Sequence, residues 1–492
     1  MRRLLRTHRA FALVLAAAVI VRVAMAIAYR PALTFVDSWA YIDAGYSQFP
    51  FEIFPERPSG YPLLLHLLAL PGRNLSVITT VQHLAGLATG VLVYALLLRL
   101  GVRRWIAAAA AAIVLLDGYA VTLEQHVLSE SLFTLSLTAS VYLVVGKDRG
   151  PQALAASGAL LALAAVMRPT GLLAIPAWVA YVLWTHRRRA LLASGLVALA
   201  LPLVAYAAYH AGETGTVGIT DQDGWFLYGR VAPIADCRGV DVPDGTRALC
   251  EPPGRKRRID PDWYVWSADS PARQLSRKVG VKRHSYLNSL LRRFGLTMIR
   301  AHPGAYLDVV SGDLRQILTP GAAGMDITIK PPERGTGRCR DCDAVATVMV
   351  DSKVRDRWFP GYSPSTHAPA AAVVAYVEAL HTARWLIPLV IAIGAIAFGL
   401  SFLPRWRGRI AHRRELLLLV GMAVPMLVGT VATTNPMVRY LVPLVPLIVC
   451  SGVLAFRDLY AFVGARSRAA ARSSSSDSSM KPAKASRSGM AS

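Results

Sequence analysis

Charged residues are scarce in this chain of 492 residues. Asp, Glu, Lys and Arg together make up 17% of it, whereas a soluble globular domain contains about a quarter. Hydrophobic residues reach 54%. These proportions exclude an ordinary soluble protein and indicate a polytopic membrane protein.

Acidic residues are the scarcer of the two charge signs, with 30 Asp and Glu against 54 Lys and Arg, a net charge of +24. In a soluble chain this excess would indicate a nucleic acid or another polyanion as partner. Here many of the basic residues lie in short segments between apolar stretches. The basicity is therefore a signal of membrane topology, and no nucleic-acid partner is expected.

Ten apolar stretches approach the length of about 17 to 25 residues that crosses a bilayer. They are residues 10–29, 76–98, 105–123, 127–146, 152–167, 170–185, 190–210, 384–403, 415–434 and 437–456. A half-length or re-entrant segment at 61–70 belongs to the same set. The sequence thus predicts an α-helical membrane protein with about 10–13 transmembrane helices. The first stretch follows "MRRLLRTHR" and lacks a small-residue cleavage site, which predicts a retained signal anchor.

The distribution of Lys and Arg predicts the orientation of these spans. With the N-terminus inside, the cytoplasmic segments hold 24 Lys and Arg residues. They are 1–10, 99–104, 147–149, 186–189, 404–414 and 457–492. The short outer loops hold only Arg30, Arg57, Arg73, Arg168 and Arg439. The positive-inside rule then places both termini in the cytoplasm, and the membrane is expected to be the plasma (inner) membrane.

Four regions follow from this pattern. Residues 1–210 form an N-terminal membrane module with the first outer loop at 30–60, and residues 211–383 form one extracytoplasmic soluble domain of α/β or mixed structure. Residues 384–456 supply the last spans, and 457–492 form a low-complexity, disordered cytoplasmic tail. No internal repeat is evident, which disfavours the duplicated architecture of many transporters.

Cysteine is rare, with five residues, and four of them lie in the extracytoplasmic domain. This location favours disulfides, with Cys237 paired to Cys250 and Cys339 to Cys342 as the preferred connectivity among three. A zinc site made by the same four and a redox-active CxxC are weaker alternatives.

An amphipathic pattern in the same domain predicts a helix whose apolar face carries Leu287, Leu290, Leu291, Phe294 and Met298. Such a helix lies on the outer leaflet of the membrane or packs into the core of the domain, and the pattern fits both.

Acidic residues cluster in the first outer loop, where Asp37, Asp43, Glu52 and Glu56 stand among aromatics beside a membrane span. Carboxylates at this position are costly to desolvate and are functional candidates. Partial burial against Trp39 and Tyr41 would raise the pKa of Asp37 and suit it to act as a general base. The plainer interpretation is a solvated loop acid or a helix cap.

Four segments resemble, in the right order, the GT-C superfamily of polyprenyl-phosphate-dependent glycosyltransferases. The branch is the family-39-like one, related to protein O-mannosyltransferases and lipid A aminoarabinose transferases. The segments are "DSWAYID" with "RPSGYPLLLHLLAL" (37–43 and 57–70), "LEQHVLSESLFTLSL" (123–137), "AAVMRPTGLLAIP" (164–176) and "NPMVRYLVPLVPLIV" (435–449). Many relatives have two adjacent acids in the first loop, whereas Ser38 follows Asp37 here.

The resemblance implies that Asp37 is the base for an acceptor hydroxyl and that Arg168 and Arg439 hold the donor phosphate. Tyr440 would position the donor, and Arg57 is a weaker candidate for phosphate contact. Arginines suit this work because they bind phosphate in bidentate fashion. The alternative for each arginine is a side chain that extends to the membrane interface as an anchor.

A second acidic group, Glu124 and Glu130 with His126, lies at the outer end of the fourth span. Glu124 and His126 would shape the acceptor pocket, and a divalent metal held with a further ligand is a weaker interpretation. Glu130 follows Ser129 and also fits the start of a helix. His66 and His83, within apolar stretches, are expected to be hydrogen-bonded structural residues.

These observations together predict a membrane glycosyltransferase that moves a sugar from a polyprenyl-phosphate donor to a hydroxyl group on the extracytoplasmic face. The acceptor is a saccharide, lipid or protein of the cell envelope, and membrane lipids surround the enzyme. A transporter or flippase of lipid-linked saccharides is the main alternative, and an assembly scaffold is another. A transporter predicts charges deep in several spans, but only Arg22 fits that description.

Overall fold

The computed structural model describes residues 7–47, 57–146, 148–186, 188–250, 261–280, 284–319, 352–362, 365–381, 386–404, 410–434 and 437–478. Glu52, Glu56, Cys339 and Cys342 lie outside these residues, so the expectations for them stay untested.

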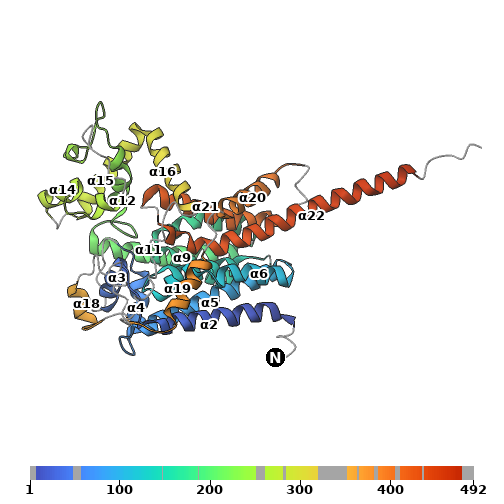
Figure 1. Cartoon of the computed structure of the whole chain (residues 1–492). Helices are drawn as coiled ribbons and strands as arrows, with labels where there is room; N and C mark the ends of the chain where they lie inside the picture. The colour runs from blue at the N-terminus through green and yellow to red at the C-terminus, as the bar shows by residue number, and fades with distance from the viewer. Residues whose placement is uncertain are drawn as a thin grey trace, which may run out of the picture.

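Helices of different lengths pack against one another in the N-terminal module (Figure 1). They are α2 (Arg9–Ala28), α5 (Leu75–Arg99), α6 (Arg104–Leu115), α7 (Gly118–Gln125), α8 (Glu130–Val144), α9 (Pro151–Met167), the 3-10 helix η1 (Pro169–Ala174), α10 (Ile175–Thr185) and α11 (Arg189–Thr214). Side-chain caps fix the first residues of two of these helices. The Asn74 side chain caps α5 by accepting from the Ser76 N–H at 2.9 Å, and the Asp117 carboxylate caps α7 by accepting from the Ala120 N–H at 2.7 Å.

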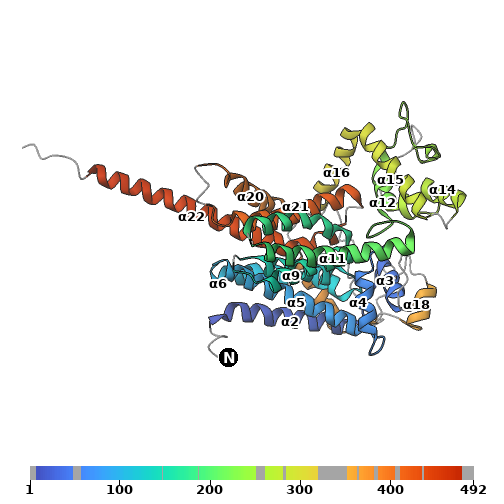
Figure 2. The same cartoon turned by 180° about the vertical axis from the view of Figure 1, so that it is seen from behind.

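The last helices complete the bundle. They are α20 (Leu386–Leu400), α21 (Arg413–Thr433), the 3-10 helices η5 (Val438–Tyr440) and η6 (Val442–Leu444), and α22 (Val445–Ser478). Figure 1 shows α22 continuing well past the end of the bundle at which the N-terminus lies. From behind, α11 lies on the outside of the bundle next to α9 (Figure 2).

Five helices in the described residues are long and apolar enough to cross a membrane, or six if the bent pair α6 and α7 counts as one span. They include α2 and α11, in which large apolar side chains such as Ile20 and Leu201 are about two-thirds exposed. Side chains of this kind need a lipid surround. Each of the ten expected spans coincides with a helix or a helix pair, but four of them rest on shorter apolar helices, namely α8, α9, η1 with α10, and α20.

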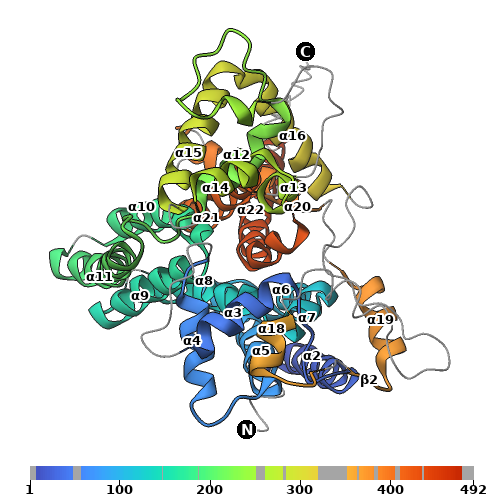
Figure 3. The same ribbon diagram turned by 90° about the vertical axis from the view of Figure 1, so that its left-hand side faces the viewer.

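The first loop, between α2 and α5, and the inserted region meet at one end of the bundle (Figure 3). The loop contains β1 (Tyr29–Arg30), α3 (Val36–Tyr46) and α4 (Gly60–Ala69). The inserted region contains α12 (Asp223–Val231), η2 (Ala232–Ile234), η3 (Arg247–Leu249), α13 (Pro261–Trp266), α14 (Pro271–Val279), α15 (His284–Ala301), α16 (Pro303–Leu318), α18 (Ser352–Trp358), β2 (Ser365–Thr366) and α19 (Ala370–Ala379).

The expected mixed α/β structure of this inserted region is wrong for the residues that the structure describes. They form short helices, and their one strand, β2, pairs antiparallel with β1 over two residues. Proline at the first position starts α13, α14 and α16, where its missing N–H costs no hydrogen bond. Helix starts of this kind, repeated over short intervals, leave little room for strands.

The amphipathic helix α15 packs into the core of this region. Leu287, Leu291, Phe294 and Met298 are buried against Trp225 and its neighbours. The core interpretation of its apolar face is therefore correct, and the outer-leaflet interpretation is not.

A disulfide joins Cys237 to Cys250 in the same region. We expect the double replacement of both cysteines by serine to destabilise the region by about 3 kcal/mol, because a loop of this length loses its covalent constraint on the unfolded chain. Thermal unfolding of the purified protein with and without reductant measures the effect. An unchanged unfolding midpoint under reducing conditions would contradict it.

Candidate active site

Asp37 lies in the first turn of α3 and contacts two arginines that are distant in the sequence. It forms an ion pair with Arg57 and a second one with Arg439, whose Nη2 lies 2.7 Å from Asp37 Oδ2. The Ser38 hydroxyl accepts from the Phe35 N–H at 2.8 Å and stabilises this turn. Ser38, which stands where many relatives have a second acid, thus has a local role that holds Asp37 at the start of the helix.

Glu130 continues the charged group beyond Arg439. Its Oε1 lies 2.5 Å from Arg168 Nη1 and 3.8 Å from Arg439 Nη1. Arg168 also donates to Ser129 Oγ at 3.3 Å. It emerges where α9 ends, immediately before Pro169, because proline disfavours helix at the preceding residue. Asp37, Arg57, Arg439, Glu130 and Arg168 therefore form one ionic cluster, called the arginine cluster below.

Aromatic rings line this cluster. Tyr440 lies under both Arg168 and Arg439, with distances of 5.1 and 5.2 Å from the guanidinium carbons to the ring centre. The ring centre of Phe35 lies 5.0 Å from the guanidinium carbon of Arg439, and the ring centre of Tyr41 lies 5.6 Å from that of Arg57. These distances are typical of cation–π contacts, which hold guanidinium groups in a fixed orientation.

The two acids of the cluster differ in exposure. The side chain of Glu130 is 1% exposed, whereas that of Asp37 is 15% exposed and that of Arg57 is 17% exposed. The Glu130 side chain is thus closed off from solvent, whereas Asp37 and Arg57 each keep part of their surface accessible. Three cations against two anions leave these five side chains with one positive charge.

Burial alone would raise the pKa of Asp37, but the positive charges and hydrogen bonds of Arg57 and Arg439 outweigh it and bring that pKa well below its ordinary value. The raised pKa expected from the sequence is therefore wrong, because the two arginines are not its sequence neighbours. Asp37 is ionised at neutral pH. The stabilisation that its ion pairs contribute is present there and is lost only as the pH falls through the lowered pKa.

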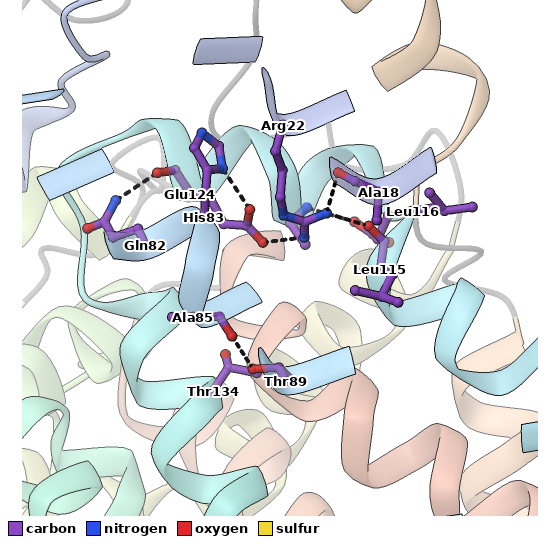
Figure 4. Close-up of polar contacts among 12 residues, drawn as sticks. Ala18, Arg22, Gln82, His83, Ala85, Thr89, Leu115, Leu116, Glu124 and Thr134 are labelled. Carbon is purple, nitrogen blue, oxygen red and sulfur yellow. Dashed lines mark hydrogen bonds and ion pairs between the residues drawn. The ribbon is translucent and has the colours of Figure 1, made fainter. Parts of the chain in front are cut away.

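Glu124 lies apart from the arginine cluster, in a second buried network (Figure 4). Its carboxylate accepts from Arg22 at 2.7 Å and lies 2.8 Å from His83 Nδ1. Gly86 makes this approach feasible, since a Cβ there would overlap the Glu124 carboxylate. The structure therefore brings together six of the seven sequence-predicted site residues, including Tyr440, and separates Glu124 from them.

Arg22 is the partner of Glu124 that sequence analysis did not pair with it. Its Nη1 also donates to the Leu115 carbonyl at 2.8 Å. The signal was present, because a single arginine within an apolar span requires a buried partner. His83 and His66 are hydrogen-bonded, to Glu124 and to the Gly45 carbonyl, as predicted.

The metal interpretation of Glu124 and His126 does not fit this arrangement, since both Glu124 oxygens are occupied by Arg22 and His83. The His126 Nδ1 lies 2.8 Å from the Thr122 carbonyl instead. Within the described ranges, no three His, Cys, Asp or Glu side chains come together in a way that could hold a metal ion.

A small cavity of about 30 Å³ is lined by Glu130 and Glu124 together with Thr89 and Thr134. This volume accommodates about two water molecules. The two acids thus face one hydratable space, although they bind different partners.

Asp43, six residues after Asp37, belongs to a different contact. It accepts from the Trp358 indole N–H at 2.6 Å, and Arg357 lies 3.7 Å away. Tyr362 packs edge-on against Trp39 and donates to the Ala32 carbonyl at 2.9 Å. The segment around α18 therefore holds α3 against the bundle, and Asp43 is an attachment point rather than a solvated loop acid.

Residues 70–168 match the family model described as dolichyl-phosphate-mannose-protein mannosyltransferase. The chain resembles the protein mannosyltransferases. The match confirms the resemblance predicted from the sequence motifs. The mannosyltransferase-like segment includes Glu130 and Arg168, whereas Asp37, Arg57 and Arg439 lie outside it. No curated protein and no solved structure matches the chain.

Proposed function

We propose that this protein is a membrane glycosyltransferase that moves a sugar from a polyprenyl phosphate to an acceptor hydroxyl at the outer face of the membrane. The observation that carries the proposal is the arginine cluster itself. It places a partly exposed carboxylate within hydrogen-bond reach of Arg57 and Arg439, with Arg168 next to them through Glu130.

The proposed reaction has a simple charge balance. The acceptor oxygen forms a bond to the anomeric carbon of the sugar while the bond from that carbon to the phosphate oxygen breaks. The acceptor proton passes to Asp37, and the polyprenyl phosphate leaves with the bonding electron pair. The phosphate thereby changes from one negative charge to two, and protonation of Asp37 changes the cluster from one positive charge to two. Fixed positive groups that match a developing charge are an effective form of catalysis.

The alternatives explain less of the structure. A scaffold leaves the outer carboxylates and arginines without a shared task, although they form one partly exposed cluster. A transporter is expected to have accessible charges deep in its spans, whereas Arg22 is closed off, with 3% of its side chain exposed, by its contact with Glu124.

The description of the matched family names dolichyl phosphate mannose and protein, so a mannosyl polyprenyl phosphate is the first donor to test. The purified protein in lipid nanodiscs is incubated with labelled donors and a cell-envelope fraction, and release of polyprenyl phosphate is measured. Turnover with at least one donor is expected. A complete absence of turnover with mannosyl, glucosyl and pentosyl donors would contradict the proposal.

Replacing Arg439 by Gln is expected to lower kcat/KM at least about 100-fold, since one charge-assisted contact to the leaving phosphate is lost. Arg99→Gln is the matched control, because Arg99 is the last residue of α5, is not part of the arginine cluster, and donates to the Tyr142 carbonyl. Donor consumption is measured for both. Equal loss in the two variants would show that the effect of Arg439 is not local.

A further inference from the structure

The Asp37 carboxylate binds the two guanidinium groups that the phosphate of the proposed donor would need. Its two oxygens pair separately with Arg57 and Arg439. A phosphodiester presents two anionic oxygens to guanidinium groups much as a carboxylate does, and both bind arginine in bidentate fashion. The carboxylate and the donor phosphate would therefore compete for the same N–H donors.

The other acid of the cluster is not exchangeable in this way. The side chain of Glu130 is 1% exposed, and its carboxylate lies 2.5 Å from Arg168. It stays as a fixed counter-charge when an anion enters. Asp37, with 15% of its side chain exposed, is the acid of the cluster that solvent reaches.

Asp37 is also a poor base while both arginines hold it, because they keep its pKa well below the ordinary value. The Asp37 carboxylate becomes a stronger base once it separates from the two arginines. If the arginines bind a phosphate in its place, Asp37 therefore gains the basicity that the proposed reaction requires.

We propose that Asp37 and the donor phosphate compete for Arg57 and Arg439, so that donor binding releases the Asp37 carboxylate and makes it available to the acceptor hydroxyl. This inference rests on the proposed function and adds an order to it. The donor binds first, and the base becomes active only afterwards. An uncharged lipid-linked sugar would not exchange with the carboxylate and would leave the base held.

The test uses farnesyl phosphate, a short polyprenyl phosphate, and farnesol, which has the same chain without the phosphate. Their binding to the full-length protein in nanodiscs is measured by isothermal titration calorimetry. Asp37→Asn is expected to bind farnesyl phosphate at least about tenfold more tightly than the wild type, since hydrogen bonds to charged groups each contribute about that much. Farnesol binding is expected to stay unchanged.

Asp43→Asn is the matched control. It removes the same charge from the same helix, and asparagine keeps the oxygen that accepts from Trp358. A general electrostatic effect would strengthen phosphate binding equally in both variants and would overturn the proposal. Asp37→Ser serves as a second variant, and size-exclusion chromatography checks that each is folded.

The outcomes separate the two proposals. If neither the wild type nor either Asp37 variant binds farnesyl phosphate better than farnesol, the phosphate site fails and the proposed function fails with it. If the wild type prefers farnesyl phosphate but neither Asp37 variant binds it more tightly, the competition is refuted while the phosphate site stands.

Discussion

Asparagine in place of Asp37 is expected to reduce sugar transfer about 1,000-fold while the protein stays folded. General-base catalysis contributes roughly 100- to 10,000-fold, and asparagine cannot accept the acceptor proton. The side chain still fills the same volume and offers one oxygen to Arg57 or Arg439. The loss therefore belongs to the chemical step, and single-turnover transfer of a labelled sugar with saturating donor measures it.

Asp43→Asn provides the comparison for this result as well. It changes the same residue type six positions later, where the partner is Trp358. We expect it to transfer sugar at close to the wild-type rate. Retention of more than a tenth of the activity by Asp37→Asn would remove Asp37 from the base role, and equal loss in both variants would indicate a disturbed α3.

Leucine in place of Arg22 is expected to destabilise the protein by about 3–5 kcal/mol, because it leaves the buried Glu124 carboxylate without its cationic partner. Arg22 and Glu124 are 3% and 4% exposed, so neither solvent nor salt replaces the lost contact. Denaturant-induced unfolding in detergent measures the effect. An unfolding free energy within about 0.5 kcal/mol of the wild type would contradict it.

The double variant Arg22→Leu with Glu124→Gln identifies the cause. Neutral glutamine removes the uncompensated charge and still has an oxygen for His83, so part of the lost stability is expected to return. If the double variant is as unstable as the sum of the single changes, the cost comes from packing and not from the charge.

The meeting of Asp37, Arg168 and Arg439 could be expected from the sequence, although their roles remain proposals. The positive-inside rule places all three at the outer ends of spans, and residues at the same ends of neighbouring helices are close in space. Their pairing could not be derived. Arg57 and Arg439 lie 20 and 402 residues from Asp37 in the sequence, and no local pattern indicates which arginine meets which acid.

Glu124 shows why acids that are close in the sequence can have different partners. It lies six residues before Glu130, yet α7 is bent by 47° from α6, and Glu124 meets Arg22 and His83. Its place depends on the missing side chain of Gly86 in another helix. Contacts of this kind depend on the packing of three helices, which hydrophobic periodicity does not encode.

The pairing of Arg22 with Glu124 also bears on how the protein is made. The two residues are 102 positions apart, so the ribosome delivers the first helix long before the acid that neutralises it. Until α7 emerges, the nascent chain carries an arginine whose transfer into hydrocarbon is costly. We expect α2 to stay beside the insertion machinery during this interval and to settle into lipid only when its partner arrives.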